Sequence, residues 1–246
     1  MKKQILILIL SFYFMSNAQA QLENSIFAIV QISYNVPGEE SVIGGIRGTA
    51  FLINDSTVLT ANHILNSKNY QPNPGFKFAQ FWLLNRGKNL IIPLSKDYLK
   101  SIEEIDATII TLPESVKCSL IVSECSANLK DSIYNFGHIK DKMPITKAHW
   151  NNNLLVIDEY DLDKYVSDKT GTIIEIRKQT INYNDVKLND ITTLKPSFKG
   201  ITGMSGGPLI RNNEVIGLMS FGFPADSDIK DSVFAISIDE IMVRLK

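Results

Sequence analysis

The segment "GMSGGPLI" (203–210) places Ser205 among three glycines and a proline. Glycine loses more conformational freedom on folding than any other residue, so this density is costly unless the backbone needs it. In a serine hydrolase, backbone N–H groups that point at the oxyanion of the tetrahedral intermediate stabilise the transition state by about 3 to 4 kcal/mol. A glycine turn lets such groups converge, and we expect those of Gly203 and Ser205 to do so. The alternative is a glycine-rich hairpin with an uninvolved serine.

A serine nucleophile needs a general base, and the chain has three histidines, His63, His138 and His149. His63 ends "GTAFLINDSTVLTANH", which predicts two strands and a turn, and so stands at a strand end. Asp106 precedes the apolar run "ATIITL", where a buried carboxylate would need a donor such as an imidazole N–H. Taken singly, His63 also fits a loop or core residue, and Asp106 an exposed one. In the order histidine, aspartate, serine, each at a strand edge, they favour nucleophilic catalysis by Ser205.

The other histidines have weaker interpretations. His138 follows a strand-ending glycine in "IYNFGHIK", which suggests either a place in the substrate groove or a surface loop. His149 is assigned no role. The three histidines are widely spaced and no His-Glu-x-x-His segment is present, so no metal site is predicted and no cofactor is expected.

Cys118 and Cys125 are the only cysteines. In an exported chain, a disulfide that closes the small loop "CSLIVSEC" is favoured over two free thiols. Nothing in the sequence connects either thiol to a histidine, so catalytic thiol chemistry is the weaker interpretation.

The elements that must position these residues are expected to be strands. Short β-branched or aromatic runs bounded by Gly, Pro, Asn, Asp and Ser recur along the chain. The long helices that βαβ units need are missing, which predicts an all-β fold in two halves. The one good helical pattern is the C-terminal segment "SIDEIMVRLK".

The first 20 residues have the pattern of a signal peptide. A basic start, "MKK", precedes the apolar run "ILILILSFYFM", and "SNAQA" ends in small residues. We therefore expect cleavage after Ala20 and a secreted or periplasmic protein without a membrane span. The net charge of −1, with no basic block, gives no sign of a nucleic-acid partner.

With these motifs in place, the sequence resembles the trypsin-like (chymotrypsin-fold) serine peptidases, closer to the bacterial HtrA-like and glutamyl-endopeptidase branches. The matching segments are those around His63, Asp106 and Ser205, followed by "EVIGLMSFG" and "VFAISIDEI". The resemblance implies two six-stranded antiparallel β-barrels. The N-terminal barrel (21–125) would carry the histidine and aspartate, and the C-terminal barrel (126–246) the serine and a short helix.

The resemblance also assigns roles. Ser205 would be the nucleophile, His63 the general base and then acid, and Asp106 the residue that orients the imidazole. The N–H groups of Gly203 and Ser205 would form the oxyanion hole. Met204 stands where zymogen-activated members carry an aspartate that pairs with a newly freed amino terminus. The resemblance therefore implies a site formed without that switch, and we expect no PDZ domain after the protease domain.

Substrate contacts are implied as well. In the family, a strand matching Ser220, Phe221 and Gly222 pairs with the substrate backbone, and Gly222 would leave the pocket mouth open to larger side chains. Lys199 stands where trypsin-type enzymes carry the aspartate of the primary pocket. It would favour an acidic substrate residue if it reached that pocket, and the alternative is a solvent-facing lysine.

Two functions of different classes follow. The first is a secreted serine endopeptidase that cleaves proteins or peptides through an acyl-enzyme. The second is a protease-fold protein that binds a peptide or protein without significant turnover. The sequence does not indicate an oligomeric state.

Overall fold

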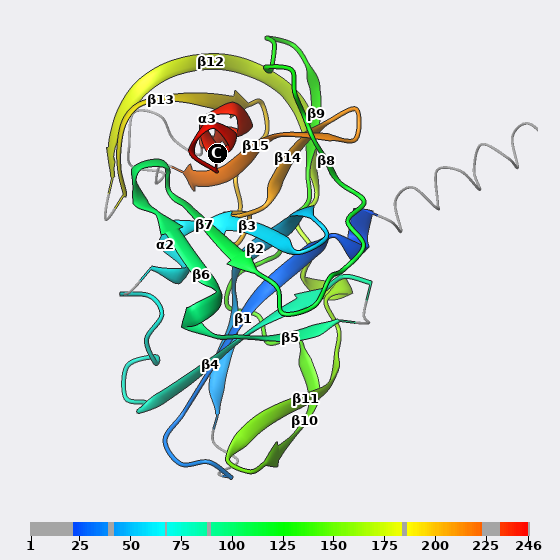
Figure 1. Cartoon of the computed structure of the whole chain (residues 1–246), viewed down its shortest axis with the longest axis vertical. Coiled ribbons are helices and arrows are strands. Elements are labelled where there is room, and N and C mark those ends of the chain that lie inside the picture. Colours follow the sequence, from blue (N-terminus) through cyan, green and yellow to red (C-terminus); the bar gives the residue numbers. More distant parts are fainter. Residues whose placement is uncertain are drawn as a thin grey trace, which may run out of the picture.

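The computed structural model describes residues 22–38, 42–66, 68–87, 90–183, 186–222 and 232–245. The signal peptide expected at 1–20 lies outside these ranges. Within them, no helix has both the length and the apolar character needed to cross a membrane. The architecture is mostly β, with two large sheets that curl toward barrels (Figure 1).

The first sheet carries the N-terminal half. Its described strands run in the order β5-β4-β1-β2-β3-β7-β6, with every neighbouring pair antiparallel. Strand β1, which lies in the interior of the sheet between β4 and β2, is buried along its whole length, as its almost wholly apolar sequence favours. The seven strands are β1 (Ile26–Tyr34), β2 (Ile43–Asn54), β3 (Thr57–Ala61), β4 (Phe78–Asn85), β5 (Ile91–Leu94), β6 (Leu99–Ile102) and β7 (Ala107–Thr111).

The second sheet forms a closed ring of six antiparallel strands in the order β14-β9-β12-β13-β16-β15, because β14 also pairs with β15. Strand β8 joins β15 in parallel as a seventh. These strands are β8 (Ile121–Val122), β9 (Ser132–Asn135), β12 (Lys169–Tyr183), β13 (Val186–Pro196), β14 (Pro208–Arg211), β15 (Glu214–Gly222) and β16 (Val233–Ser237).

The all-β double-barrel fold is thus confirmed. The strand count differs in detail: the second barrel has the six strands expected plus the short β8, and the first sheet has seven in the described residues. The predicted C-terminal helix is α3 (Ile238–Leu245). Strands β12 and β13 arch around it (Figure 1), and its buried Ile238 and Ile241 belong to the same core cluster as Ile181 and Leu188.

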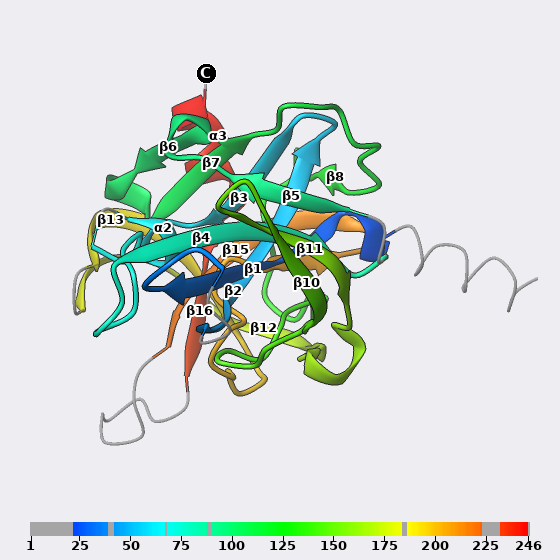
Figure 2. The same ribbon diagram turned by 90° about the horizontal axis from the view of Figure 1, so that it is seen from below.

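A separate hairpin, β10 (Ile145–Asn151) with β11 (Leu154–Tyr160), forms a two-stranded sheet. It packs on the end of the first sheet that lies away from the second barrel, as Figures 1 and 2 show from two sides. Its buried Leu155 and Ile157 share a core cluster with Val30 of β1. The remaining short helices are α2 (Asn62–Leu65), η1 (Lys96–Tyr98), η2 (Glu103–Ile105) and η3 (Asp163–Tyr165).

The disulfide predicted between Cys118 and Cys125 is wrong, because both are free thiols. The segment between them is not a closed loop: it contains β8, which runs extended beside β15. Extended chain carries its ends apart, whereas a disulfide needs Cα atoms about 4.4 to 6.8 Å apart. Cys118 instead packs against the core, where burial raises the pKa of its thiol.

Candidate active site

His63 and Asp106 meet because their strands pair in register. Strand β3 ends at Ala61, which lies opposite Ala107 at the start of β7. His63, two residues after the end of β3, and Asp106, directly before β7, are therefore neighbours. The His63 Nδ1 atom lies 2.8 Å from Asp106 Oδ2, and because a carboxylate accepts, Nδ1 carries the proton. In this tautomer of the neutral imidazole, Nε2 is the nitrogen that can accept a proton.

Asp106 is buried and held on several sides, so its interpretation as an exposed residue is wrong. Its Oδ1 accepts from the backbone N–H of His63 at 2.8 Å, and Oδ2 also accepts a hydrogen bond from the Ser220 hydroxyl. Its carbonyl accepts from Asn62 N at 2.9 Å. Its φ of 46° is left-handed, a conformation that non-glycine residues adopt mainly where other contacts compensate. The hydrogen bonds that the carboxylate accepts from His63 and Ser220 offset the cost of burying its charge.

The turn around Ser205 needs its glycines. Gly203 has φ +106° and Gly206 has φ +82°, backbone conformations that L side chains rarely adopt. A Cβ on Gly203 would lie 2.3 Å from His138 O, and one on Gly206 would lie 2.0 Å from Thr49 O. The glycines therefore let this turn pack directly against the backbone of strand β2 and of the segment that follows β9.

The same turn presents two unoccupied donors. The Thr202 carbonyl accepts from Lys140 N at 2.9 Å, and because a trans peptide points its C=O and N–H in opposite directions, the N–H of Gly203 faces away from that contact. Among the described residues, neither this N–H nor that of Ser205 donates to a protein acceptor. The Thr49 hydroxyl donates to Gly203 O at 2.9 Å and fixes the turn further. Such a pair of N–H groups suits a developing oxyanion.

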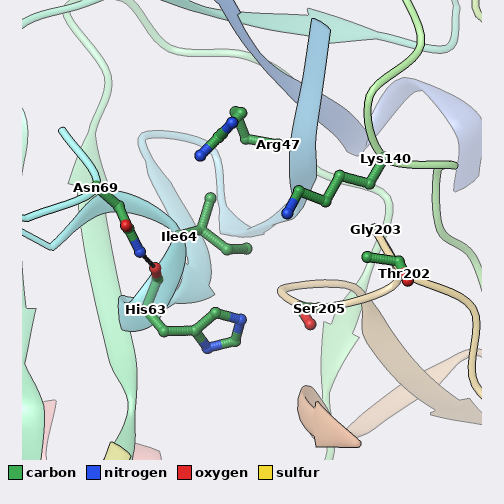
Figure 3. Close-up of a pocket in the computed structure, with 8 residues that line it drawn as sticks. All are labelled: Arg47, His63, Ile64, Asn69, Lys140, Thr202, Gly203 and Ser205. Carbon is green, nitrogen blue, oxygen red and sulfur yellow. Dashed lines mark hydrogen bonds between the residues drawn. The ribbon is translucent and has the colours of Figure 1, made fainter. Parts of the chain in front are cut away.

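His63 and Ser205 line one pocket, of about 120 Å³. Figure 3 shows the imidazole and the serine side chain on facing walls, one from each half of the molecule. The Asn69 side chain donates to the His63 carbonyl and steadies the histidine wall. The lining residues are Arg47, His63, Ile64, Asn69, Lys140, Thr202, Gly203 and Ser205.

Met204 is buried in an apolar cluster. Its Sδ atom accepts from Ile201 N at 3.2 Å. The side chain that follows Gly203 is therefore held by packing and one weak hydrogen bond. A methionine carries no charge, so the turn is formed without an ion pair at this position.

The strand residues expected to contact substrate have different environments. The Ser220 side chain is buried and directed at Asp106, so it supports that carboxylate and does not line the pocket. Phe221 is also buried and stacks on Phe234 at 5.4 Å between ring centroids. Gly222 is exposed, and Lys199 is exposed without lining the pocket.

The space expected beside Gly222 is partly filled. The Val233 Cγ1 atom lies 3.2 Å from where a Cβ on Gly222 would be, and 1.9 Å from where one on Gly200 would be. A methyl group therefore stands between the two glycines, and the expectation of an open mouth for larger side chains is not met there.

His138 lies neither in a surface loop nor in the pocket, because it is fully buried. Its backbone N–H donates to Thr49 Oγ1 at 3.1 Å, and its Nδ1 lies 3.3 Å from the same oxygen. Burial, together with the charge of Arg86, lowers the pKa of this imidazole to about 3. His138 is thus a neutral support beneath the Gly203 turn.

The sequence reasoning missed Thr49, Arg47 and Lys140. Thr49 lies in a segment already noted for its strand pattern, but its contact with Gly203 joins residues far apart in the chain. Arg47 and Lys140 likewise come from segments that are distant in the chain and that the fold brings together at the pocket. Among the described residues, no three His, Cys, Asp or Glu gather in a way that could hold a metal ion.

Comparison with solved structures shows the same fold at low identity. The chain is similar to the Rv3671c protease of M. tuberculosis in its active form, with 19% identity, 93% of this chain and 82% of that chain covered, and a TM-score of 0.56. It is also similar to the MamO protease domain of Magnetospirillum magneticum, with 11% identity, coverage of 92% and 98%, and a TM-score of 0.60. A third similar structure is the HtrA-type protease AlgW with a decapeptide, with 12% identity, coverage of 92% and 64%, and a TM-score of 0.60.

No curated protein sequence matches the chain significantly. The family model for trypsin matches residues 28–242, which include every residue of the site described above. The chain therefore belongs to the trypsin family of serine endopeptidases.

Proposed function

We propose that this chain is a secreted endopeptidase that hydrolyses peptide bonds with Ser205 as nucleophile, His63 as general base and acid, and Asp106 as the group that orients the imidazole. The observation that carries the proposal is the shared pocket. A histidine with a buried carboxylate on Nδ1 faces a serine whose turn presents two unoccupied N–H groups.

The chemistry follows from this arrangement. Ser205 Oγ attacks the carbonyl carbon of the scissile bond while His63 Nε2 takes its proton. The carbonyl oxygen becomes an oxyanion and accepts from the N–H groups of Gly203 and Ser205. The imidazolium then gives its proton to the amine nitrogen, the C–N bond breaks, and an acyl-enzyme remains. A water molecule, deprotonated by the same histidine, releases the acid and restores the serine.

We further propose a preference for small side chains on the acyl side of the scissile bond. The substrate strand would lie along Ser220–Gly222. Its side chain beside the nucleophile would then meet the Val233 methyl group between Gly200 and Gly222. A hydrophobic pocket discriminates by about 1 to 3 kcal/mol for each methylene that does not fit.

The second candidate is a peptide-binding protein without turnover. Its support is that AlgW, a protease similar in fold to this chain, was solved together with a decapeptide. The unoccupied N–H pair and the hydrogen bond between His63 and Asp106 argue for hydrolysis, because a binding protein has no need of either.

The proposed secretion of the enzyme depends on the signal peptide expected at 1–20.

The test is a peptide-library digest with the mature protein beside a Ser205→Ala variant. We expect cleavage after small residues and labelling by a fluorophosphonate probe, both lost in the variant because the nucleophilic oxygen is absent. The residual rate should be lower by about 10⁶. Tight peptide binding by a wild-type protein that neither cleaves nor labels would favour the second candidate.

A further inference from the structure

Two cationic side chains, Arg47 and Lys140, line the active-site pocket together with His63 and Ser205. Figure 3 shows both reaching into the pocket from the side opposite the imidazole. Among the residues that the structure describes, no carboxylate lines this pocket. Within the described ranges, no hydrogen bond or ion pair engages either cationic side chain. The two positive charges are therefore available to a bound molecule.

The backbone holds these two residues side by side. Asp141 N donates to Ile46 O, and Ile46 N donates to Lys142 O, both at 2.9 Å. These bonds join the loop that carries Lys140 to strand β2 directly before Arg47. Both cations are thus carried by backbone that is anchored to the Ser205 turn, since Lys140 N also donates to the Thr202 carbonyl.

Arg47 is the extra residue of a β-bulge. In the pairing of β1 with β2, Ile29 lies opposite Gly48 and Val30 lies opposite Ile46, so Arg47 has no partner across the ladder. A bulge turns a side chain away from the regular alternation and is over-represented beside active sites. Here it coincides with an arginine that lines the pocket.

The position of these charges relative to the scissile bond follows from the chemistry. His63 must deliver its proton to the leaving amine, so the leaving group lies in the part of the site that His63 lines. The strand expected to hold the acyl side, Ser220–Gly222, contributes nothing to this pocket. Arg47 and Lys140 therefore face the residues that follow the scissile bond.

We propose that the enzyme prefers substrates with an aspartate or glutamate at the first or second position after the scissile bond. This inference rests on the proposed endopeptidase function. The side-chain carboxylate would pair with Lys140 and Arg47, both partly buried, where an ion pair is screened less than at an open surface. The expected gain is about threefold to tenfold in kcat/KM for each acidic position.

The experiment uses internally quenched, C-terminally amidated peptides that differ only as Asp against Asn, or Glu against Gln, at these two positions. The enzymes are wild type, Lys140→Gln, Arg47→Gln and, as a matched control, Lys142→Gln. Lys142 is exposed in the same loop and does not line the pocket. The measured quantity is the ratio of kcat/KM for the acidic peptide to that for its amide.

At low salt, we expect this kcat/KM ratio to be about three to ten in wild type and in Lys142→Gln. In Lys140→Gln and Arg47→Gln the ratio should fall toward one. In wild type the ratio should also decrease as the salt concentration rises. A ratio near one in wild type, or one that both pocket variants retain, would overturn the inference while leaving the endopeptidase intact.

Failure of the proposed function is a different result, namely no Ser205-dependent cleavage of any peptide. In that case the inference is decided by binding. The labelled leaving-group fragments, acidic and amide, are titrated into the Ser205→Ala protein and its Lys140→Gln derivative, and fluorescence anisotropy is measured. Tighter binding of the acidic fragment that depends on Lys140 supports the inference, and equal binding overturns it.

Discussion

Two histidine–aspartate pairs in this molecule have nearly the same geometry and very different surroundings. In the pocket, His63 Nδ1 lies 2.8 Å from Asp106 Oδ2. On the β10–β11 hairpin, His149 Nδ1 lies 3.0 Å from both carboxylate oxygens of Asp158. The side chains of the first pair are 29% and 2% exposed, and those of the second are 54% and 28% exposed.

The difference shows that a short imidazole–carboxylate contact does not make a site. The Asp106 carboxylate also accepts from the backbone N–H of His63 and from the Ser220 hydroxyl. These two hydrogen bonds hold the carboxylate in position independently of the imidazole. An exposed pair such as His149–Asp158 contributes about 0 to 1 kcal/mol to stability. It also lies on a hairpin that pairs with no other sheet in the described residues, away from the Ser205 turn.

The largest effect expected from this comparison comes from matched amide substitutions in the two pairs. Asp106→Asn should lower kcat by about 10⁴, because the amide favours the wrong imidazole tautomer and no longer stabilises the imidazolium. Asp158→Asn should leave kcat unchanged. Steady-state hydrolysis of one peptide by both variants gives the result. Comparable losses in the two variants would contradict the distinction.

A smaller effect is expected from the extra donor that only the first pair has. Ser220→Ala removes one hydrogen bond to Asp106, which keeps two others, so kcat should fall about tenfold, or about 1.4 kcal/mol, with KM little changed. The control is Ser167→Ala, since the Ser167 hydroxyl is buried and has no partner in the described part of the chain. Initial rates over a range of peptide concentrations give kcat and KM separately for both variants. Equal kcat values in the two variants would mean that Ser220 does not position Asp106.

The smallest effect is expected from His138, the buried histidine that contacts no carboxylate, and it concerns the free energy of unfolding. Its folded pKa of about 3 lies below the ordinary value of 6.5, so between these pH values the unfolded chain binds the extra proton. Stability from this group is therefore complete above pH 6.5 and is lost as pH falls toward 3, by up to about 1.4 kcal/mol per pH unit.

The pH effect is isolated by comparison with a variant. Urea unfolding of wild type and His138→Gln should be measured from pH 7 to pH 4.5, because other groups also titrate in this range. The wild-type free energy of unfolding should fall more steeply with decreasing pH than that of the variant. Parallel curves would show that His138 is protonated equally in the folded and unfolded states.

Features set by local backbone and pattern were predicted correctly. Short β-branched runs between turn residues indicated the all-β double barrel. The glycines around Ser205 indicated a turn whose backbone only glycine adopts readily, and φ at Gly203 and Gly206 is indeed positive. The order of His63, Asp106 and Ser205 on strand edges also predicted which residues gather near the pocket. In each case neighbouring residues carry enough of the physical cause to be recognised without coordinates.

Features that depend on which distant segments pack together were missed or wrong. The Cys118–Cys125 disulfide was predicted from spacing, but pairing with β15 keeps that segment extended. The methyl group of Val233 between two glycines, the burial of His138 and the cationic wall of Arg47 and Lys140 all join residues far apart in the chain. Burial and charge neighbourhood are properties of the packed chain. The sequence around Ser205 was therefore enough to predict it as a candidate nucleophile. The residues proposed to select the substrate, Val233, Arg47 and Lys140, could be identified only from the packed structure.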